Sequence, residues 1–165
     1  MQKKIAYGGM ATALSVIMLV FSAYFPSGKA AALFLSSAIV YAFRIVMGSK
    51  AALAVYIASA ILGFLLSFGA SPVIAVSFAI CFGSYPVLRY FTENKPIAFV
   101  IALRALLYII YFAIVITVFK YLIPVAFPLS EALMFALGAV LFVGYDVLLK
   151  YTGEYIVQLF YRIKK

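Results

Sequence analysis

The sequence predicts an all-α membrane protein, a bundle of six transmembrane helices that forms a single domain over residues 1–165. Of the 165 residues, 68% are hydrophobic and only 10% are charged, whereas a soluble domain is about half apolar and about a quarter charged. The mean hydropathy is +1.22. The core of a soluble protein of this size does not enclose so much apolar surface, so we expect the bilayer to be the solvent.

Six apolar runs have about the 20 residues that cross a hydrocarbon core of about 30 Å. We place the spans at residues 5–25, 30–47, 51–68, 72–90, 97–121 and 129–150. Turn-forming Pro, Gly and Ser residues separate the first four, the polar stretch 92–96 follows the fourth, and Pro124 and Pro128 flank the last break. The first run is longer than the apolar region of a signal peptide, and Phe21 stands where cleavage needs a small residue, so we expect a retained helix.

The basic residues predict that both termini are cytoplasmic. With the N-terminus inside, only Lys29 and Lys120 lie outside and Arg104 lies within the fifth span, which is a strong positive-inside bias. The basic residues on the inner side are Lys3, Lys4, Arg44, Lys50, Arg89, Lys95, Lys150, Arg162, Lys164 and Lys165. Orientation and attraction to anionic lipid therefore explain the net charge of +9, and we expect no nucleic-acid partner. Residues 151–165 either form an amphipathic segment on the inner surface or extend the last helix.

Few residues in the chain are suited to catalysis. There is no His, one cysteine, Cys81, and four acidic residues. Catalytic triads, metal-ligand clusters and disulfide frameworks are therefore not expected, and the chain contains no Gly-rich loop for ATP. A membrane phosphatidyltransferase needs several acids to hold metal ions, whereas Asp146 is the only acid well inside a span. We expect a protein that is not an enzyme and has no metal or cofactor.

Arg104 and Asp146 lie at similar depths in the last two spans. An isolated cation at the bilayer centre costs about 2.5–3.5 kcal/mol, so we expect an ion pair between them if these helices are neighbours. One acid and one base do not form a path across the membrane, which favours a structural pair, or snorkelling of Arg104 to the inner headgroups, over a proton or ion relay.

Small residues and a helix break mark two further places. Ala6, Gly9 and Ala13 share one face of the first span, a spacing that lets helices approach closely; packing within the bundle and docking of a partner both remain open. Gly83 and Pro86 are expected to bend the fourth span in its inner half. Backbone groups freed by such a bend are tolerated in a membrane only where protein or a cavity covers them. We interpret that bend as a gating or partner contact.

Polar residues near the outer loops are candidates for substrate binding. Together they combine an apolar wall with a few hydroxyl and charged groups, including a cation for an anionic ligand group. Tyrosines are also common at membrane interfaces without any such role. The candidates are Tyr24, Ser27, Lys29, Tyr108, Tyr111, Lys120 and Glu131.

In size, span number and the small-residue face of its first helix, the chain resembles the substrate-binding S components of energy-coupling factor transporters, bacterial membrane proteins that capture vitamins and related micronutrients. Ala6, Gly9 and Ala13 stand where that family has an Ala-rich contact face, with Gly9 in place of an alanine. The resemblance implies a cell-membrane protein that binds cargo from outside, between the first loop and the outer parts of helices four to six. It also implies a transmembrane coupling subunit and two ATPase subunits as partners.

Two other classes remain as alternatives. A membrane scaffold resembling the six-span rod-shape-determining proteins would have interaction faces and no pocket. A free-standing secondary transporter usually shows internal repeats, and the two halves of this chain show no convincing similarity. If the chain captures a substrate, the few outer charges favour a small apolar or aromatic cargo with one anionic group.

Overall fold

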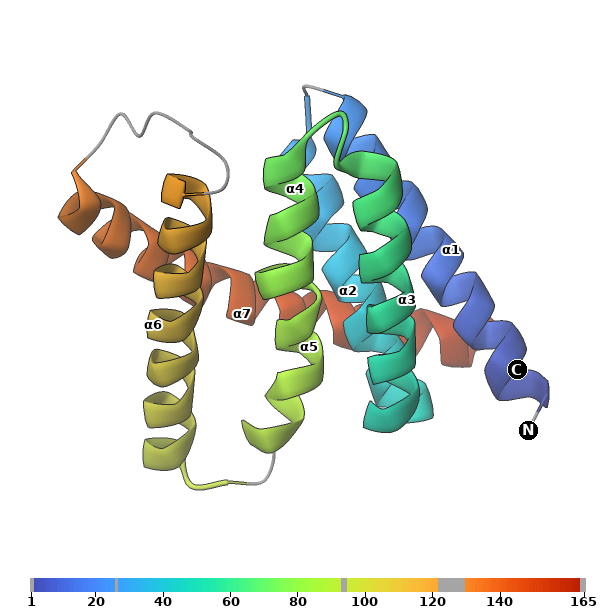
Figure 1. Cartoon of the computed structure of the whole chain (residues 1–165). Coiled ribbons are helices and arrows are strands. Elements are labelled where there is room, and N and C mark those ends of the chain that lie inside the picture. Colours follow the sequence, from blue (N-terminus) through green and yellow to red (C-terminus); the bar gives the residue numbers. More distant parts are fainter. Residues whose placement is uncertain (1, 26, 93–94, 122–129, 164–165) are drawn as a thin grey trace.

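The apolar runs of the sequence form long helices in the computed structural model, which describes residues 2–25, 27–92, 95–121 and 130–163 (Figure 1). Two short breaks hold glycines at φ of +86° and +90°, Gly28 and Gly48, in the left-handed region that favours glycine. The elements are α1 (Gln2–Tyr24), α2 (Lys29–Met47), α3 (Ser49–Ser67), α4 (Pro72–Ser77), the π-helix η1 (Phe78–Phe82), α5 (Ser84–Leu88), the 3₁₀-helix η2 (Arg89–Thr92), α6 (Ile97–Tyr121) and α7 (Glu131–Ile163).

Six segments are long and apolar enough to cross a membrane. They are Ile5–Tyr24, Lys29–Met47, Ser49–Ser67, Pro72–Phe91, Ile97–Val118 and Ala132–Gln158, and the described part of the chain contains no strand. The predicted all-α, six-span fold class is thereby confirmed in this coarse form. The predicted start of the last span at residue 129 lies outside the described residues.

The last helix is longer than predicted. α7 continues without a break from Glu131 to Ile163, a length of 33 residues, so the described part of the tail after Lys150 extends the helix. No proline interrupts residues 131–163, which is why nothing ends the helix at the predicted boundary.

The first three helices pack closely through small residues. Ser15 on α1 and Ser36 on α2 are fully buried and their hydroxyl oxygens lie 2.6 Å apart. A Cβ built on Gly63 of α3 would lie 2.5 Å from Leu19 Cδ1 of α1, so a larger residue there would require the end of the Leu19 side chain to move. Close approach of small residues is how helices associate in lipid, where the hydrophobic effect gives little drive.

α6 packs much less extensively than the first three helices. In Figure 1 it stands apart from α1, α2 and α3, while α7 runs across the back of the bundle toward the start of α1. In the most apolar stretch of α6 only 11% is buried, against 56% in that of α2. α7 contacts α2, where Gly153 lies against the ring of Tyr41. α6 therefore contributes less than the first three helices to the packing of the bundle.

Gly153 provides a test of this packing. A Cβ at Gly153 would overlap the Tyr41 ring, whereas nothing lies within 4 Å of a Cβ at Gly144 on the same helix. We expect Gly153→Ala to lower the free energy of unfolding by about 1–3 kcal/mol and Gly144→Ala to leave it unchanged or raise it, since alanine favours helix. Thermal unfolding of the two variants in detergent measures the difference, and equal midpoints would contradict the α2–α7 crossing.

Candidate functional site

The fourth span is broken in the middle, as Gly83 and Pro86 predicted. Its helix changes from α to π geometry over Phe78–Phe82 and resumes as α5 at Ser84. A proline has no backbone N–H, so Pro86 cannot donate to the carbonyl of Phe82 four residues earlier. Such a carbonyl must find another donor inside a membrane protein.

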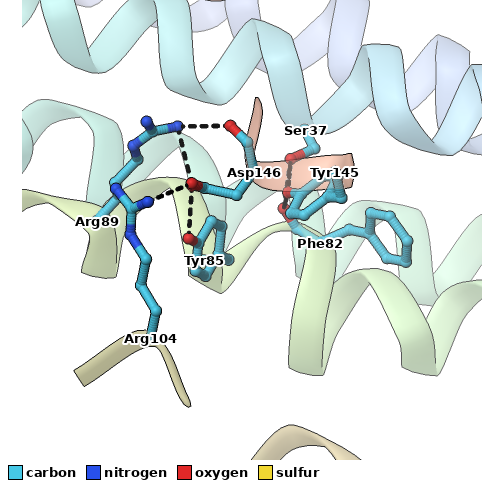
Figure 2. A network of polar contacts seen from close by, with 7 residues as sticks. All are labelled: Ser37, Phe82, Tyr85, Arg89, Arg104, Tyr145 and Asp146. Carbon is cyan, nitrogen blue, oxygen red and sulfur yellow. Dashed lines mark hydrogen bonds and ion pairs between the residues drawn. The ribbon is translucent and has the colours of Figure 1, made fainter. Parts of the chain in front are cut away.

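Side chains from two other helices supply those donors. Ser37 Oγ on α2 donates to the carbonyl oxygen of Phe82 at 2.6 Å, and the Tyr145 hydroxyl on α7 approaches the same oxygen at 3.2 Å. Ser37 and Tyr145 are also hydrogen-bonded to each other (Figure 2). The break in the fourth span is therefore the point where α2 and α7 are tied to it.

The neighbouring carbonyls are covered in the same way. The Tyr56 hydroxyl of α3 donates to the carbonyl of Ala79, and Ser84 Oγ donates to that of Ile80. Ser84 Oγ also lies 2.8 Å from the hydroxyl of Tyr111 on α6. α3, α6 and α7 thus each place a tyrosine hydroxyl at this break.

About one turn beyond this break, the fourth span contacts Asp146 of α7. Asp146 binds groups from the fourth span and from α6 (Figure 2). Its Oδ1 accepts from the Tyr85 hydroxyl at 2.6 Å and lies 3.1 Å from Arg89 Nη1, which also donates to the Asp146 backbone carbonyl at 3.1 Å. Its Oδ2 lies 2.6 Å from Arg104 Nη1 of α6. The carboxylate is 8% exposed, and this many charge-assisted contacts offset its removal from water.

The expected ion pair between Arg104 and Asp146 is therefore present, but sequence reasoning missed two members of the cluster. Arg89 was expected on the inner side, at the end of the fourth span, and Tyr85 was not singled out. The two are four residues apart, so in a helix they share a face, and that spacing was the available signal. The contacts hold the Asp146 carboxylate from three sides, which fits a structural cluster better than a relay.

An aromatic cavity of about 200 Å³ lies beside this cluster, between the broken span, α6 and α7. Almost all of its wall is apolar, and the hydroxyl of Tyr108 reaches over Gly138 to donate to the carbonyl of Phe135. A ring of aromatic side chains with a few hydroxyls is typical of sites for small apolar ligands. The lining residues are Cys81, Phe82, Tyr85, Tyr108, Tyr111, Phe112, Val115, Gly138, Leu141, Phe142 and Tyr145.

A second cavity of about 370 Å³ lies between α6 and α7 and shares Tyr108 and Phe142 with the first. Its charged lining residues are Arg104 and Asp146. The rings of Tyr108 and Phe142 have their centroids 5.5 Å apart. This aromatic pair lines both cavities and lies where they meet.

Only some of the predicted substrate-binding residues line these cavities. Tyr108 and Tyr111 line the aromatic cavity, and Tyr111 is buried. The other described candidates, Tyr24, Ser27, Lys29 and Lys120, are exposed and are absent from both linings. Glu131 begins α7, but its side chain lies outside the part of the chain that the structure describes. The cation beside these cavities is thus Arg104, a half-buried residue within α6, instead of a lysine at an outer loop.

The small-residue face of α1 is not used by the bundle. Ala6, Gly9 and Ala13 are all exposed, and nothing lies within 4 Å of a Cβ built on Gly9. Ala11 and Ser15, on the opposite face, are buried. Of the two interpretations left open by the sequence, packing within the bundle accounts for Ala11 and Ser15 but not for Ala6, Gly9 and Ala13.

The comparisons with known proteins add no family. No protein-family model, curated protein or solved structure matches the chain. Among the described residues, no group of three or more His, Cys, Asp or Glu side chains is placed to hold a metal ion. The cavities, the charged cluster and the exposed face of α1 are the features of the described structure that bear on function.

The Asp146 cluster gives a second test. Asp146→Asn keeps the shape of the side chain but removes the carboxylate that Arg89 and Arg104 share. Because breaking a buried pair at one partner is strongly destabilising, we expect a loss of about 3–5 kcal/mol. The matched control is Glu154→Gln, an exposed acid on the same helix, which should change little. Thermal unfolding compares the two, and similar effects would show that Asp146 is not a structural anchor.

Proposed function

We propose that this protein is the substrate-capture subunit of a micronutrient importer of the energy-coupling factor type, located in a bacterial cell membrane with both termini in the cytoplasm. The observation that carries the proposal is the aromatic cavity between the broken span, α6 and α7. A scaffold needs interaction faces but no aromatic cavity of this kind.

The cavity favours a small, mostly apolar cargo. Its volume of about 200 Å³ is below the roughly 300–1,000 Å³ of sites for drug-sized ligands. Tyrosine and phenylalanine rings on its wall suit an aromatic or aliphatic body, since aromatic pairs gain about 0.5–1.5 kcal/mol beyond their buried area. The hydroxyls of Tyr108 and Tyr111 already bond to Phe135 and Ser84, so few polar groups remain for the cargo.

The weak packing of α6 supports access to the cavity. A segment with few buried contacts separates from its neighbours at a lower free-energy cost than the core of a protein. α6 lines the cavity and packs against little else. A movement of α6 away from η1 would open the cavity without disturbing the core formed by α1, α2 and α3.

The exposed face of α1 supports association with a transmembrane coupling subunit. Ala6, Gly9 and Ala13 are exposed small residues on one side of α1, and such residues let another helix approach closely. Transport would then depend on two partner ATPase subunits, because this sequence has no phosphate-binding loop.

The proposal predicts a bound small molecule and copurifying partners. Mass spectrometry of the protein purified in detergent from its native host should detect a stoichiometric low-molecular-weight ligand together with a transmembrane subunit and ATPases. An empty protein that copurifies with cell-wall or division proteins would instead favour the scaffold resembling the rod-shape-determining proteins.

The docking face predicts a separate loss. Gly9→Leu and Ala13→Leu place bulky side chains on the exposed face, so we expect at least a tenfold loss of the coupling subunit in a pull-down, equivalent to about 1.4 kcal/mol. Gly144→Leu, at an exposed glycine of α7 with nothing near its Cβ position, is the control and should pull down normal amounts. Unchanged association of both α1 variants would rule out this face as the contact.

A further inference from the structure

We propose that Arg104 binds an anionic group of the cargo in the cavity between α6 and α7, so that the cargo is an apolar molecule carrying one carboxylate or phosphate. This inference rests on the proposed capture function and adds the chemical class of the substrate. It starts from the hydrogen-bonding capacity of Arg104 and the cavity beside it.

Arg104 has more donors than its observed partner uses. A guanidinium group carries five N–H donors, and the polar contact of Arg104 in the described structure is the one from Nη1 to Asp146 Oδ2 at 2.6 Å. Its Nε is buried and has no hydrogen-bond partner among the described residues. A buried donor of a charged group that lacks an acceptor is unfavourable, which points to an acceptor that the protein does not itself supply.

Asp146 is already heavily used by other groups. Its Oδ1 accepts from Tyr85 and pairs with Arg89, and its backbone carbonyl accepts from Arg89 as well. The carboxylate therefore neutralises Arg104 only in part, because it also faces a second guanidinium. An anion beside Arg104 would neutralise the positive charge that remains when one carboxylate is shared by two guanidinium groups.

The cavity itself provides no other acceptor side chain. Apart from Arg104, Asp146 and Tyr108, its lining is apolar, and the Tyr108 hydroxyl is engaged with the carbonyl of Phe135. Lipid chains offer no acceptor at this depth. A guanidinium group binds carboxylate or phosphate through two parallel hydrogen bonds, so an anion of either kind matches the site.

The neighbouring aromatic cavity accounts for the rest of the ligand. Because the two cavities share Tyr108 and Phe142, a molecule with its anion at Arg104 would extend its apolar body along these rings. The inferred cargo is therefore amphiphilic, with its negative charge at Arg104 and its apolar part toward Tyr111 and Val115.

Calorimetric titration of the full chain in a non-ionic detergent tests the anion preference. The probes are phenylacetate, 4-phenylbutyrate and octanoate, each compared with its neutral amide. We expect at least one acid to bind at least about tenfold more tightly than its amide, the ratio typical of a hydrogen bond to a charged group. Equal binding of every acid and its amide would overturn the anion site while leaving the aromatic cavity, and so the proposed function, in place.

Variants assign the preference to Arg104. Arg104→Gln and Arg89→Gln each remove one arginine from Asp146, but Arg89 is absent from the cavity lining, so only Arg104→Gln should abolish the preference. Ala139→Phe fills the cavity and leaves both ion pairs intact, so it should block binding even if Arg104→Gln fails to fold. Equal loss in the two arginine variants, or full binding by Ala139→Phe, would overturn the proposal.

Membrane lipid is the alternative source of the anion. Native mass spectrometry with dioleoyl phosphatidylglycerol and dioleoyl phosphatidylcholine separates the two sources. Arg104-dependent binding of phosphatidylglycerol without binding of any small acid would support the anion site but contradict the capture function. Absence of Arg104-dependent binding to every probe would overturn the anion site itself.

Discussion

The arrangement of the second half of the chain depends on one carboxylate held out of water. Asp146 contacts Tyr85 and Arg89 of the broken span and Arg104 of α6 from its place on α7. In hydrocarbon, where apolar packing gives little preference for one helix position over another, such contacts fix register and orientation. The position of α6, which otherwise packs sparsely, follows largely from the contact of Arg104 with Asp146 and from the Tyr111 and Tyr108 hydroxyls.

The break in the fourth span works together with this carboxylate. Pro86 removes one backbone donor, and the carbonyl of Phe82 gains two side-chain partners from α2 and α7. Tyr145, which bonds to that carbonyl, is the residue before Asp146. Two adjacent residues of α7 thus contact two successive parts of the fourth span, and the aromatic cavity lies between these contacts and α6.

The fold class and the helix positions could be predicted because apolar runs of membrane length leave few alternatives. The ion pair between Arg104 and Asp146 could be predicted for a similar reason, since an isolated charge in a span requires a partner. The cavity could not be predicted, because it depends on how far α6 stands from its neighbours. Lys29 and Lys120 were attractive candidates as outer cations, yet exposure at the loops keeps both away from the cavities.

The length of α7 gives the molecule a mechanical connection between its two halves. At about 1.5 Å per residue, 33 residues span about 50 Å, more than the hydrocarbon thickness. The helix lines the two cavities with residues 138–147 and crosses Tyr41 at Gly153. Beyond that crossing Ile156 and Val157 line a third cavity, whose other side includes Tyr7 and Met10 of α1. If α7 tilted about its crossing with Tyr41 at Gly153, a movement that widened the cavities at one end would also change the distance between its other end and α1.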